Sequence, residues 1–411
     1  MKKLLRLSLG FIFLVMLYLY VHNPILPFGV GSVKLLYPFA LLFIFFKVKT
    51  FSRYLSLFRT ECILLLLLIF YSVFEFLFSG EPNTMRLHIV GFMEYFVLPF
   101  FLIQGMRLPG GKEEDHFIRF MLITACVGAV ITTACLLVPS FNEFVRSTAN
   151  AYVLESMDEF RASTSYRGFG ISEDLTYSYG IVQAIFFAMT LYCFKDHKWV
   201  LPFSFLILLS VALNARTGLV VVAFGLIVFL VGKGRGAAIL VLLGLVVIFA
   251  NMVPILNLLG VAPETLDWLE IFIEETGSIF KSRSLTASVT TSYLFDELIV
   301  LPRDAIEWLF GCGRDIYWSL TRRSDMGWII QLNYGGLCYM ALELVFLATL
   351  FVRLSKAGYA KVAVFFALAF LVANTKGPAL PNSGIFRLLM LFYVYYIMTA
   401  ENRRRWEIRH G

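Results

Sequence analysis

The chain has 411 residues, of which 59% are hydrophobic and only 15% are charged, whereas a soluble domain is typically about half apolar and about a quarter charged. The net charge of +7 does not indicate a nucleic-acid-binding surface, because the Lys and Arg residues stand between apolar runs and are not gathered on one soluble face. The apolar runs do not alternate in polarity, which excludes a transmembrane β-barrel and favours membrane-spanning helices.

The first apolar run, residues 4–21, follows the basic start MKKLLR. Because this run is long and no small-x-small cleavage site follows it, we interpret it as a retained first helix and not as a cleaved signal peptide. Similar runs recur along the chain, and we expect an all-α, polytopic membrane helix bundle of about twelve transmembrane helices. The other expected spans are 29–46, 61–78, 88–105, 117–138, 176–194, 199–214, 217–232, 237–254, 326–352, 360–374 and 384–400.

Alternate connections between these spans are short and basic, for example KVKTFSRYLSLFR, KDHK, GKGRG and RLSKAGYAK. This positive-inside pattern predicts that both termini are cytoplasmic. Two long segments, 139–175 and 255–325, then fall outside the membrane, and they hold 17 of the 28 acidic residues. We expect a single integral membrane domain over 1–411 in which these segments are the first and second long external loops.

The second long segment is expected to contain two short amphipathic helices. Helical spacing of apolar residues predicts one helix over 263–275, lying on the membrane surface or across the bundle. The other is predicted over 302–311, with Pro302 near its first position and Gly311 at its end. The apolar faces would hold Leu266, Leu269 and Ile273 in the first helix and Ile306, Leu309 and Phe310 in the second.

Several well-known signatures are missing from the sequence. It has no GxxxxGK[ST] loop, no HExxH and no GxSxG, so it does not predict ATP hydrolysis or those hydrolase sites. Among its six cysteines, Cys312 alone lies clearly in an extramembrane loop, and no CxxC spacing occurs. We therefore expect no disulfide framework, no bound metal and no cofactor.

Arginines on the expected outer side form the first candidate feature, because their planar fork matches phosphate and they keep their charge when partly desolvated. The alternative is that they pair with the nearby acidic residues. They are Arg146, Arg161, Arg167, Arg283, Arg303, Arg314, Arg322 and Arg323, with Arg216 and Arg387 in or beside short helices on that side.

Arg216 is notable because it separates two apolar runs that are each only about 15–16 residues long, short for a full membrane crossing. Short or interrupted segments often mark binding sites at membrane depth, where a charged residue faces a cavity or a partner. The alternative interpretation is an arginine that snorkels from a tight turn.

Residues 307–337 form the third candidate feature. Charged side chains precede a transmembrane helix there, and aromatic side chains are interleaved with them, a mixture that suits a carbohydrate ligand carrying phosphate. A carboxylate at the membrane entry, Asp325, is a candidate base. The alternative for the aromatic residues is an interfacial belt. The residues concerned are Trp308, Arg314, Asp315, Tyr317, Trp318, Arg322, Arg323, Asp325 and Trp328.

Ionisable residues also occur inside the expected spans, namely Lys34, Glu75, Glu94 and Glu343. They either pair within the bundle or belong to a proton path, and the second possibility leaves a transporter open.

Four stretches carry a resemblance to a known family: NARTGL after an apolar helix, LFGCG, SDMGWIIQLNYGG leading into a helix, and NTKGP followed by FRLLMLFYVYY. With these stretches, the second half of the chain resembles bacterial O-antigen and capsular polysaccharide polymerases. These enzymes are similar to C-type glycosyltransferases and extend lipid-linked repeat units on the external face of the inner membrane.

The resemblance implies a multi-pass protein of the bacterial inner membrane that moves a growing glycan from undecaprenyl pyrophosphate to an incoming lipid-linked repeat unit, without a nucleotide or other cofactor. Implied partners are the undecaprenyl-pyrophosphate-linked oligosaccharide, membrane lipid and a chain-length regulator protein, and no nucleic acid. Asp325 or Asp315 would be the catalytic base. The pyrophosphate would be held by Arg167, Arg216, Arg314, Arg323, Lys376 and Arg387, and the sugar by Trp308, Tyr317 and Trp318.

Two alternatives remain. An O-antigen ligase would have the same topology and donor, but the resemblance leads us to expect a histidine in the long outer loop of a ligase, and 255–325 contains none. A non-catalytic lipid-linked oligosaccharide flippase or ion-coupled transporter would be expected to show repeated halves and shorter outer loops.

Overall fold

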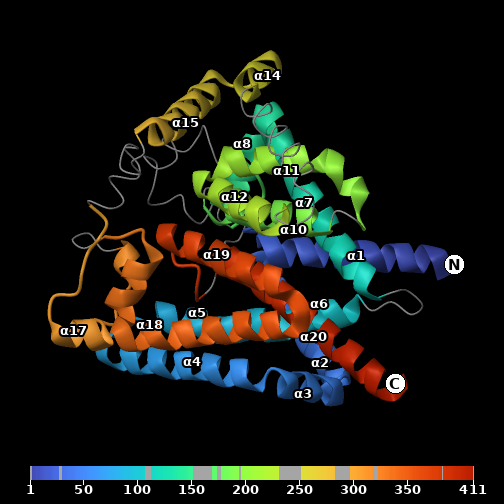
Figure 1. Cartoon of the computed structure of the whole chain (residues 1–411), viewed down its shortest axis with the longest axis vertical. Helices are drawn as coiled ribbons and strands as arrows, with labels where there is room; N and C mark the ends of the chain where they lie inside the picture. The colour runs from blue at the N-terminus through green and yellow to red at the C-terminus, as the bar shows by residue number, and fades with distance from the viewer. Residues whose placement is uncertain are drawn as a thin grey trace. The chain divides into compact units, whose positions relative to one another are not determined.

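The computed structural model describes residues 2–26, 30–106, 113–150, 169–173, 177–193, 196–230, 251–282, 297–318, 323–381 and 383–410. Over these residues the chain is helical with connecting loops. The described residues contain no β-strand and one isolated β-bridge, between Ile25 and Gly31. The all-α prediction is therefore confirmed (Figure 1).

Five helices of the described chain are long and apolar enough to cross a membrane, or six if a pair bent by 103° counts as one span. This finding indicates a membrane protein. The five are Arg59–Ser79, Asn83–Gly105, His116–Leu137, Gly327–Lys376 and Gly384–Ile408, and the bent pair is Ser32–Phe46 with Val48–Leu57.

The total of twelve transmembrane helices stays a prediction. Four of the expected spans correspond to shorter apolar helices, Ser8–His22, Ser178–Cys193, Lys198–Asn214 and Arg216–Leu230. Two more, 326–352 and 360–374, lie in the single stretch Gly327–Lys376, which is broken at Gly358 with a φ of 93°. Most of the span 237–254 lies outside the described residues.

The chain divides into two compact units, which are described separately. Unit 1 comprises 1–21, 33–118 and 298–411, and unit 2 comprises 22–32 and 119–297. The expectation of a single membrane domain therefore stays a prediction.

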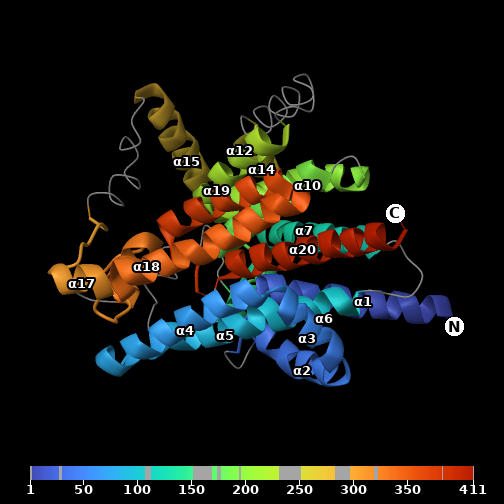
Figure 2. The same cartoon turned by 60° about the horizontal axis from the view of Figure 1, so that its bottom comes forward.

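Unit 1 is organised around α18, which packs against α4, α17 and α19. Figures 1 and 2 show α4 running beside α18, with α17 at one end of α18. The helices of unit 1 are α1 (Lys2–His22, to Val21), η1 (Ser32–Leu35, from Val33), α2 (Leu36–Phe46), α3 (Val48–Leu57), α4 (Arg59–Ser79), α5 (Asn83–Phe92), η2 (Met93–Val97), α6 (Leu98–Gly105), α17 (Ala305–Phe310), η5 (Ile316–Trp318), α18 (Gly327–Leu354), η6 (Ser355–Tyr359), α19 (Ala360–Lys376) and α20 (Gly384–His410).

Helix α18 is interrupted at Gly336, whose φ of 63° and ψ of −165° are not helical. An interruption leaves carbonyl groups without helical partners, and lipid cannot satisfy them. Here the loop after α17 supplies the donors: the amide of Cys312 donates to the Asn333 carbonyl at 2.7 Å and that of Gly313 to the Tyr334 carbonyl at 2.8 Å. The stretches LFGCG and NYGG, which the sequence analysis singled out, therefore pair with each other.

The helix predicted over 302–311 is shorter than expected. It begins at Ala305, because Asp304 caps it by accepting hydrogen bonds from two backbone amides, both at 2.9 Å. Pro302 lies ahead of the helix and is not at its first position. The predicted apolar face of Ile306, Leu309 and Phe310 is exposed.

Unit 2 is built on α10, which packs against α11 and α12. The helix predicted over 263–275 is present as α15, with Leu266 and Leu269 buried as expected and Ile273 exposed. Part of the first expected external loop, 139–175, is helical. The helices of unit 2 are α7 (Glu113–Leu137, from Arg119), α8 (Pro139–Asn150), α10 (Ser178–Cys193), η3 (Lys198–Val200), α11 (Leu201–Asn214), α12 (Arg216–Leu230), α14 (Met252–Leu258) and α15 (Pro263–Ser282).

Candidate functional site

Four of the predicted site residues meet immediately before α18. Asp325 lies between two cations, with 3.6 Å from its Oδ1 to Nε of Arg323 and 4.0 Å from its Oδ2 to Nζ of Lys376. The guanidinium of Arg323 also lies 5.8 Å from the ring centre of Tyr317, within the range of a cation–π contact. We call Tyr317, Arg323, Asp325 and Lys376 the Asp325 cluster.

The charged side chains of the Asp325 cluster are partly exposed. The side chains of Arg323, Lys376 and Asp325 are 58%, 35% and 26% exposed. The two cation–carboxylate distances exceed those of charge-assisted hydrogen bonds, which are about 2.7–2.9 Å. In addition, Oδ1 of Asp325 is shielded from solvent and accepts no hydrogen bond within the described part of the chain. The arrangement thus offers a carboxylate acceptor beside two positive charges.

Local packing explains why Asp325 and Lys376 are neighbours although 51 positions separate them. Gly327, the first residue of α18, fits against the end of α19, where an added Cβ would lie 2.6 Å from the Gly377 carbonyl. The segment before α18 is fixed by the buried Ser324, whose hydroxyl donates to the Leu298 carbonyl at 2.7 Å. Both contacts need small residues, and SDMG supplies them.

Asp315, the other candidate base, lies in a different environment. Its Oδ1 accepts the amide hydrogen of Tyr317 at 2.9 Å, and its own amide donates to Oε2 of Glu81 at 3.2 Å. Burial raises the pKa of Asp315, and the Tyr317 amide opposes this shift. Burial also raises the pKa of Glu81. The hydrogen bond from the Asp315 amide and the positive charge of Arg314 oppose this rise.

Arg387 lies in the interior of unit 1. Its Nη1 donates to Oε2 of Glu94 at 3.1 Å, and both side chains are 1% exposed. Tyr37 donates to the other carboxylate oxygen at 2.8 Å, and Tyr20 donates to the Glu94 carbonyl at 2.6 Å. Because Glu94 already neutralises the guanidinium, this environment favours a structural ion pair over a pyrophosphate-binding role for Arg387.

Arg216 is the first residue of α12 in unit 2. The chain between α11 and α12 is extended at Ala215, with φ −151° and ψ 119°, so the predicted interruption exists. The Arg216 guanidinium lies 5.6 Å from the ring centre of Trp268. No relation between Arg216 and the Asp325 cluster follows, because they belong to different units.

The remaining predicted residues are not brought together with Asp325 by any contact of the described chain. Arg314 is exposed, and Trp308 lies half-buried on α17. Arg167 and the side chain of Trp318 lie outside the described residues. The sequence analysis missed Glu81, although an acid in the short SGEPN connection between two apolar helices was a usable signal.

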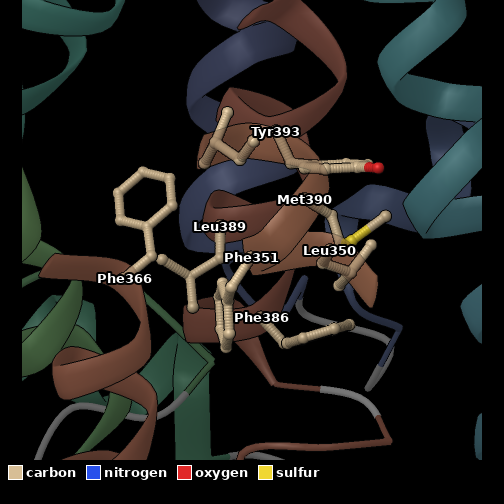
Figure 3. A pocket seen from close by; sticks show the side chains of 8 residues that line it. Leu350, Phe351, Phe366, Phe386, Leu389, Met390 and Tyr393 are labelled. Atoms are coloured by element: carbon tan, nitrogen blue, oxygen red, sulfur yellow. The ribbon is translucent and has the colours of Figure 1, made fainter. Parts of the chain in front are cut away.

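A small pocket between α18, α19 and α20 has a different character (Figure 3). It is apolar, apart from Tyr393, whose hydroxyl donates to Glu61. Its lining carries no charged group, so we do not assign it the chemistry of a phosphate-bearing ligand. The lining residues are Leu350, Phe351, Leu354, Phe366, Phe386, Leu389, Met390 and Tyr393.

The described residues contain no group of three or more His, Cys, Asp or Glu side chains placed to hold a metal ion. In comparisons with protein-family models and with curated proteins, the chain finds no match.

Proposed function

We propose that the chain is a polysaccharide polymerase, a glycosyltransferase that moves a growing glycan from undecaprenyl pyrophosphate to an incoming lipid-linked repeat unit. The observation that supports this proposal is the Asp325 cluster, where an acceptor carboxylate, two cations and an aromatic ring lie together. The family resemblance of the sequence supports it independently.

In the proposed reaction a hydroxyl of the acceptor sugar attacks the anomeric carbon of the donor glycan. Asp325 takes the hydroxyl proton as a general base. A carbon–oxygen bond forms at the anomeric carbon as its bond to the pyrophosphate oxygen breaks, so negative charge develops on the departing pyrophosphate. Arg323 and Lys376 stabilise that charge, and because they are already in place their arrangement costs little reorganisation during the reaction. Tyr317 offers its ring to the sugar.

The proposal includes a topology. Twelve transmembrane helices place both termini in the cytoplasm of a bacterium and the Asp325 cluster on the external face of its inner membrane. Reporter fusions at Asn150 and Thr286 should read as external, and fusions at Lys112 and Lys356 as cytoplasmic. A cytoplasmic reading at Thr286 would put the Asp325 cluster on the wrong side and contradict the mechanism.

The activity is tested with purified protein reconstituted with lipid-linked repeat units. The proposal predicts a ladder of polymers that remain on the lipid pyrophosphate, and a chain-length regulator protein should narrow the ladder. Transfer of glycan to lipid A would instead identify an O-antigen ligase. Movement of the lipid-linked units across the membrane without any new glycosidic bond would identify a flippase or transporter.

A further inference from the structure

The described part of unit 1 contains four buried glutamates, and two of them, Glu75 and Glu343, form no ion pair there. Glu61 and Glu94 are each paired with an arginine, at 2.5 Å from Nη1 of Arg353 and 3.1 Å from Nη1 of Arg387. Glu343 is equally buried, at 3% exposure, but its hydrogen-bond partners are uncharged. This difference is the starting point of the inference, which does not depend on the proposed polymerase activity.

Glu343 belongs to a continuous string of buried side chains. Its carboxyl group interacts with the hydroxyl of Tyr339, which lies one helical turn earlier on α18, and that hydroxyl lies 2.6 Å from Nε2 of His88. On the other side, Nε2 of Gln331 donates to Oε1 of Glu343 at 3.3 Å, and Nδ2 of Asn374 donates to Oε1 of Gln331 at 2.7 Å. Helices α5, α18 and α19 each contribute to this string.

The surroundings of Glu343 provide no compensating positive charge. Helix α4 contributes Tyr71, whose ring centre lies 5.7 Å from that of Tyr339, and Glu75, which interacts with Tyr71, and η2 contributes Tyr95. Helix α18 itself adds Tyr334. Arg387 of α20 makes its ion pair with Glu94. Within the described part of the chain, no Lys or Arg forms an ion pair with Glu343.

A carboxylate buried in this way is costly, since neither water nor a cation compensates its charge, whereas a protonated carboxyl group needs only hydrogen bonds. The string provides those bonds in two arrangements. A protonated Glu343 donates to the Tyr339 oxygen, and Tyr339 then donates to Nε2 of His88. When the Glu343 proton passes to the Tyr339 oxygen and the Tyr339 proton passes to Nε2 of His88, both bonds reverse: the His88 imidazolium then donates to Tyr339, and Tyr339 donates to the Glu343 carboxylate.

His88 adds a second, independent observation. Its ring is 0% exposed, and its Nδ1 has no hydrogen-bond partner in the described residues. A buried ring nitrogen without a partner is unusual, and it leaves the His88 end of the string with an unused donor or acceptor.

We propose that Glu343, Tyr339 and His88 form a proton-binding site in the interior of unit 1, with Glu343 as the group that holds the proton. Its ligand is the hydrogen ion, and the Asp325 cluster is not part of it. The site is of the kind that couples a membrane protein to a proton gradient, a role that a polymerase activity alone does not require.

Infrared spectroscopy of the full-length protein in lipid nanodiscs tests the proposal, because a protonated carboxyl group has a carbonyl stretch that a carboxylate lacks and that shifts in D₂O. At neutral pH the wild type should show this band, and Glu343→Gln should lose a component of it. The matched variant Glu61→Gln, at an arginine-paired glutamate, should keep that component. An unchanged carboxyl region in Glu343→Gln would overturn the proposal.

If Glu343→Gln does not fold, Tyr339→Phe provides the second test. It leaves the acid in place but removes the tyrosine hydroxyl with which the carboxyl group interacts, so the component assigned to Glu343 should shift in frequency. A carboxyl region in Tyr339→Phe that matches the wild type would equally overturn the proposal.

Discussion

Asp325 and Glu343 are carboxyl groups attached to the same helix, yet their environments differ. Asp325 lies just before α18, is partly exposed and has two cations at 3.6 and 4.0 Å. Glu343 lies within α18, is 3% exposed and accepts a hydrogen bond from the uncharged Gln331. Cations beside an accessible carboxylate suit anionic ligands, whereas uncharged partners in a buried place suit a bound proton.

The comparison teaches that the position of an acidic residue in the sequence does not decide its chemistry. Both residues were selected by a similar sequence signal, because each is an acidic residue in or beside an apolar run. What separates them is the charge of their neighbours: the cations Lys376 and Arg323 for Asp325, and the uncharged Gln331 and Tyr339 for Glu343. The following predictions test this separation.

Removing the cations of the Asp325 cluster should have the largest effect. Each charge-assisted contact that strengthens in the transition state is worth on the order of 3 kcal/mol, or roughly a hundredfold in rate. We therefore expect Arg323→Ala and Lys376→Ala each to slow polymer formation by about that factor. The measurement is polymer yield per unit of folded protein in the reconstituted assay.

The control for these variants is Arg405→Ala, since Arg405 is an exposed arginine that also pairs with a carboxylate, Glu401, at 2.8 Å. It should leave the rate unchanged. Normal rates for both Arg323→Ala and Lys376→Ala would remove the pyrophosphate-binding role from the cluster.

Arg216 can be tested by itself for the pyrophosphate-binding role that the family resemblance implies. If Arg216 holds pyrophosphate, Arg216→Lys should fail nearly as badly as Arg216→Ala, because lysine keeps the charge but loses the two-pronged guanidinium. Each loss should approach a hundredfold in rate. A normal polymer ladder from an abundant Arg216→Ala protein would contradict a pyrophosphate-binding role for Arg216. The contact between Arg216 and Trp268 would then be structural.

The interruption of α18 should be sensitive to a single methyl group. Gly336→Ala places a side chain at φ 63°, with its Cβ 2.5 Å from the Phe310 amide nitrogen. We expect a loss of about 2–4 kcal/mol in stability, seen as a lower thermal unfolding midpoint. Gly358→Ala is the matched control, because φ is also positive there but no atom lies within 4 Å.

The control should cost only about 1–2 kcal/mol. If Gly358→Ala were as destabilising as Gly336→Ala, the contact between the α17 loop and the interruption would not contribute to stability.

The smallest effect concerns pH. Burial raises the pKa of both Asp315 and Glu81 in the folded protein, so the folded state binds more protons than the unfolded state above the ordinary carboxyl range. The stability these groups contribute is complete below their unfolded pKa values, about 4, and is lost as the pH rises through their folded values. The thermal midpoint should fall slightly over this window.

Glu81→Gln should flatten this slope, whereas Glu401→Gln, at an exposed glutamate paired with Arg405, should not. An identical slope in wild type and Glu81→Gln would show that the contact between Glu81 and Asp315 does not control it.

The sequence predicted those features that depend on local patterns. The apolar runs indicated helices, the spacing of Leu266 and Leu269 indicated the buried face of α15, and Asp325 was selected by its place before an apolar helix. The interruption at Gly336 was not predicted, because NYGGL lies in a stretch that is apolar on both sides and its stability comes from the loop at 311–313.

Pairings between residues that lie far apart in the sequence were also not predicted from the sequence pattern. Arg387 was predicted to hold pyrophosphate, whereas in the structure its Nη1 donates a hydrogen bond to Glu94, 293 positions away. Beyond α18 itself, the neighbours His88 and Asn374 of the string around Glu343 come from other helices, α5 and α19. Spacing within one helix carries no information about contacts between helices.

The role of Asp325 as the general base is tested by Asp325→Asn in the reconstituted polymerase assay. Asparagine keeps the shape of the side chain but cannot accept the hydroxyl proton as a carboxylate does, so we predict a loss on the order of 10²–10⁴ in rate, with single repeat units left unextended. Asp315→Asn should retain a ladder. A folded Asp325→Asn protein that makes polymers of normal length, or a loss confined to Asp315→Asn, would contradict the account.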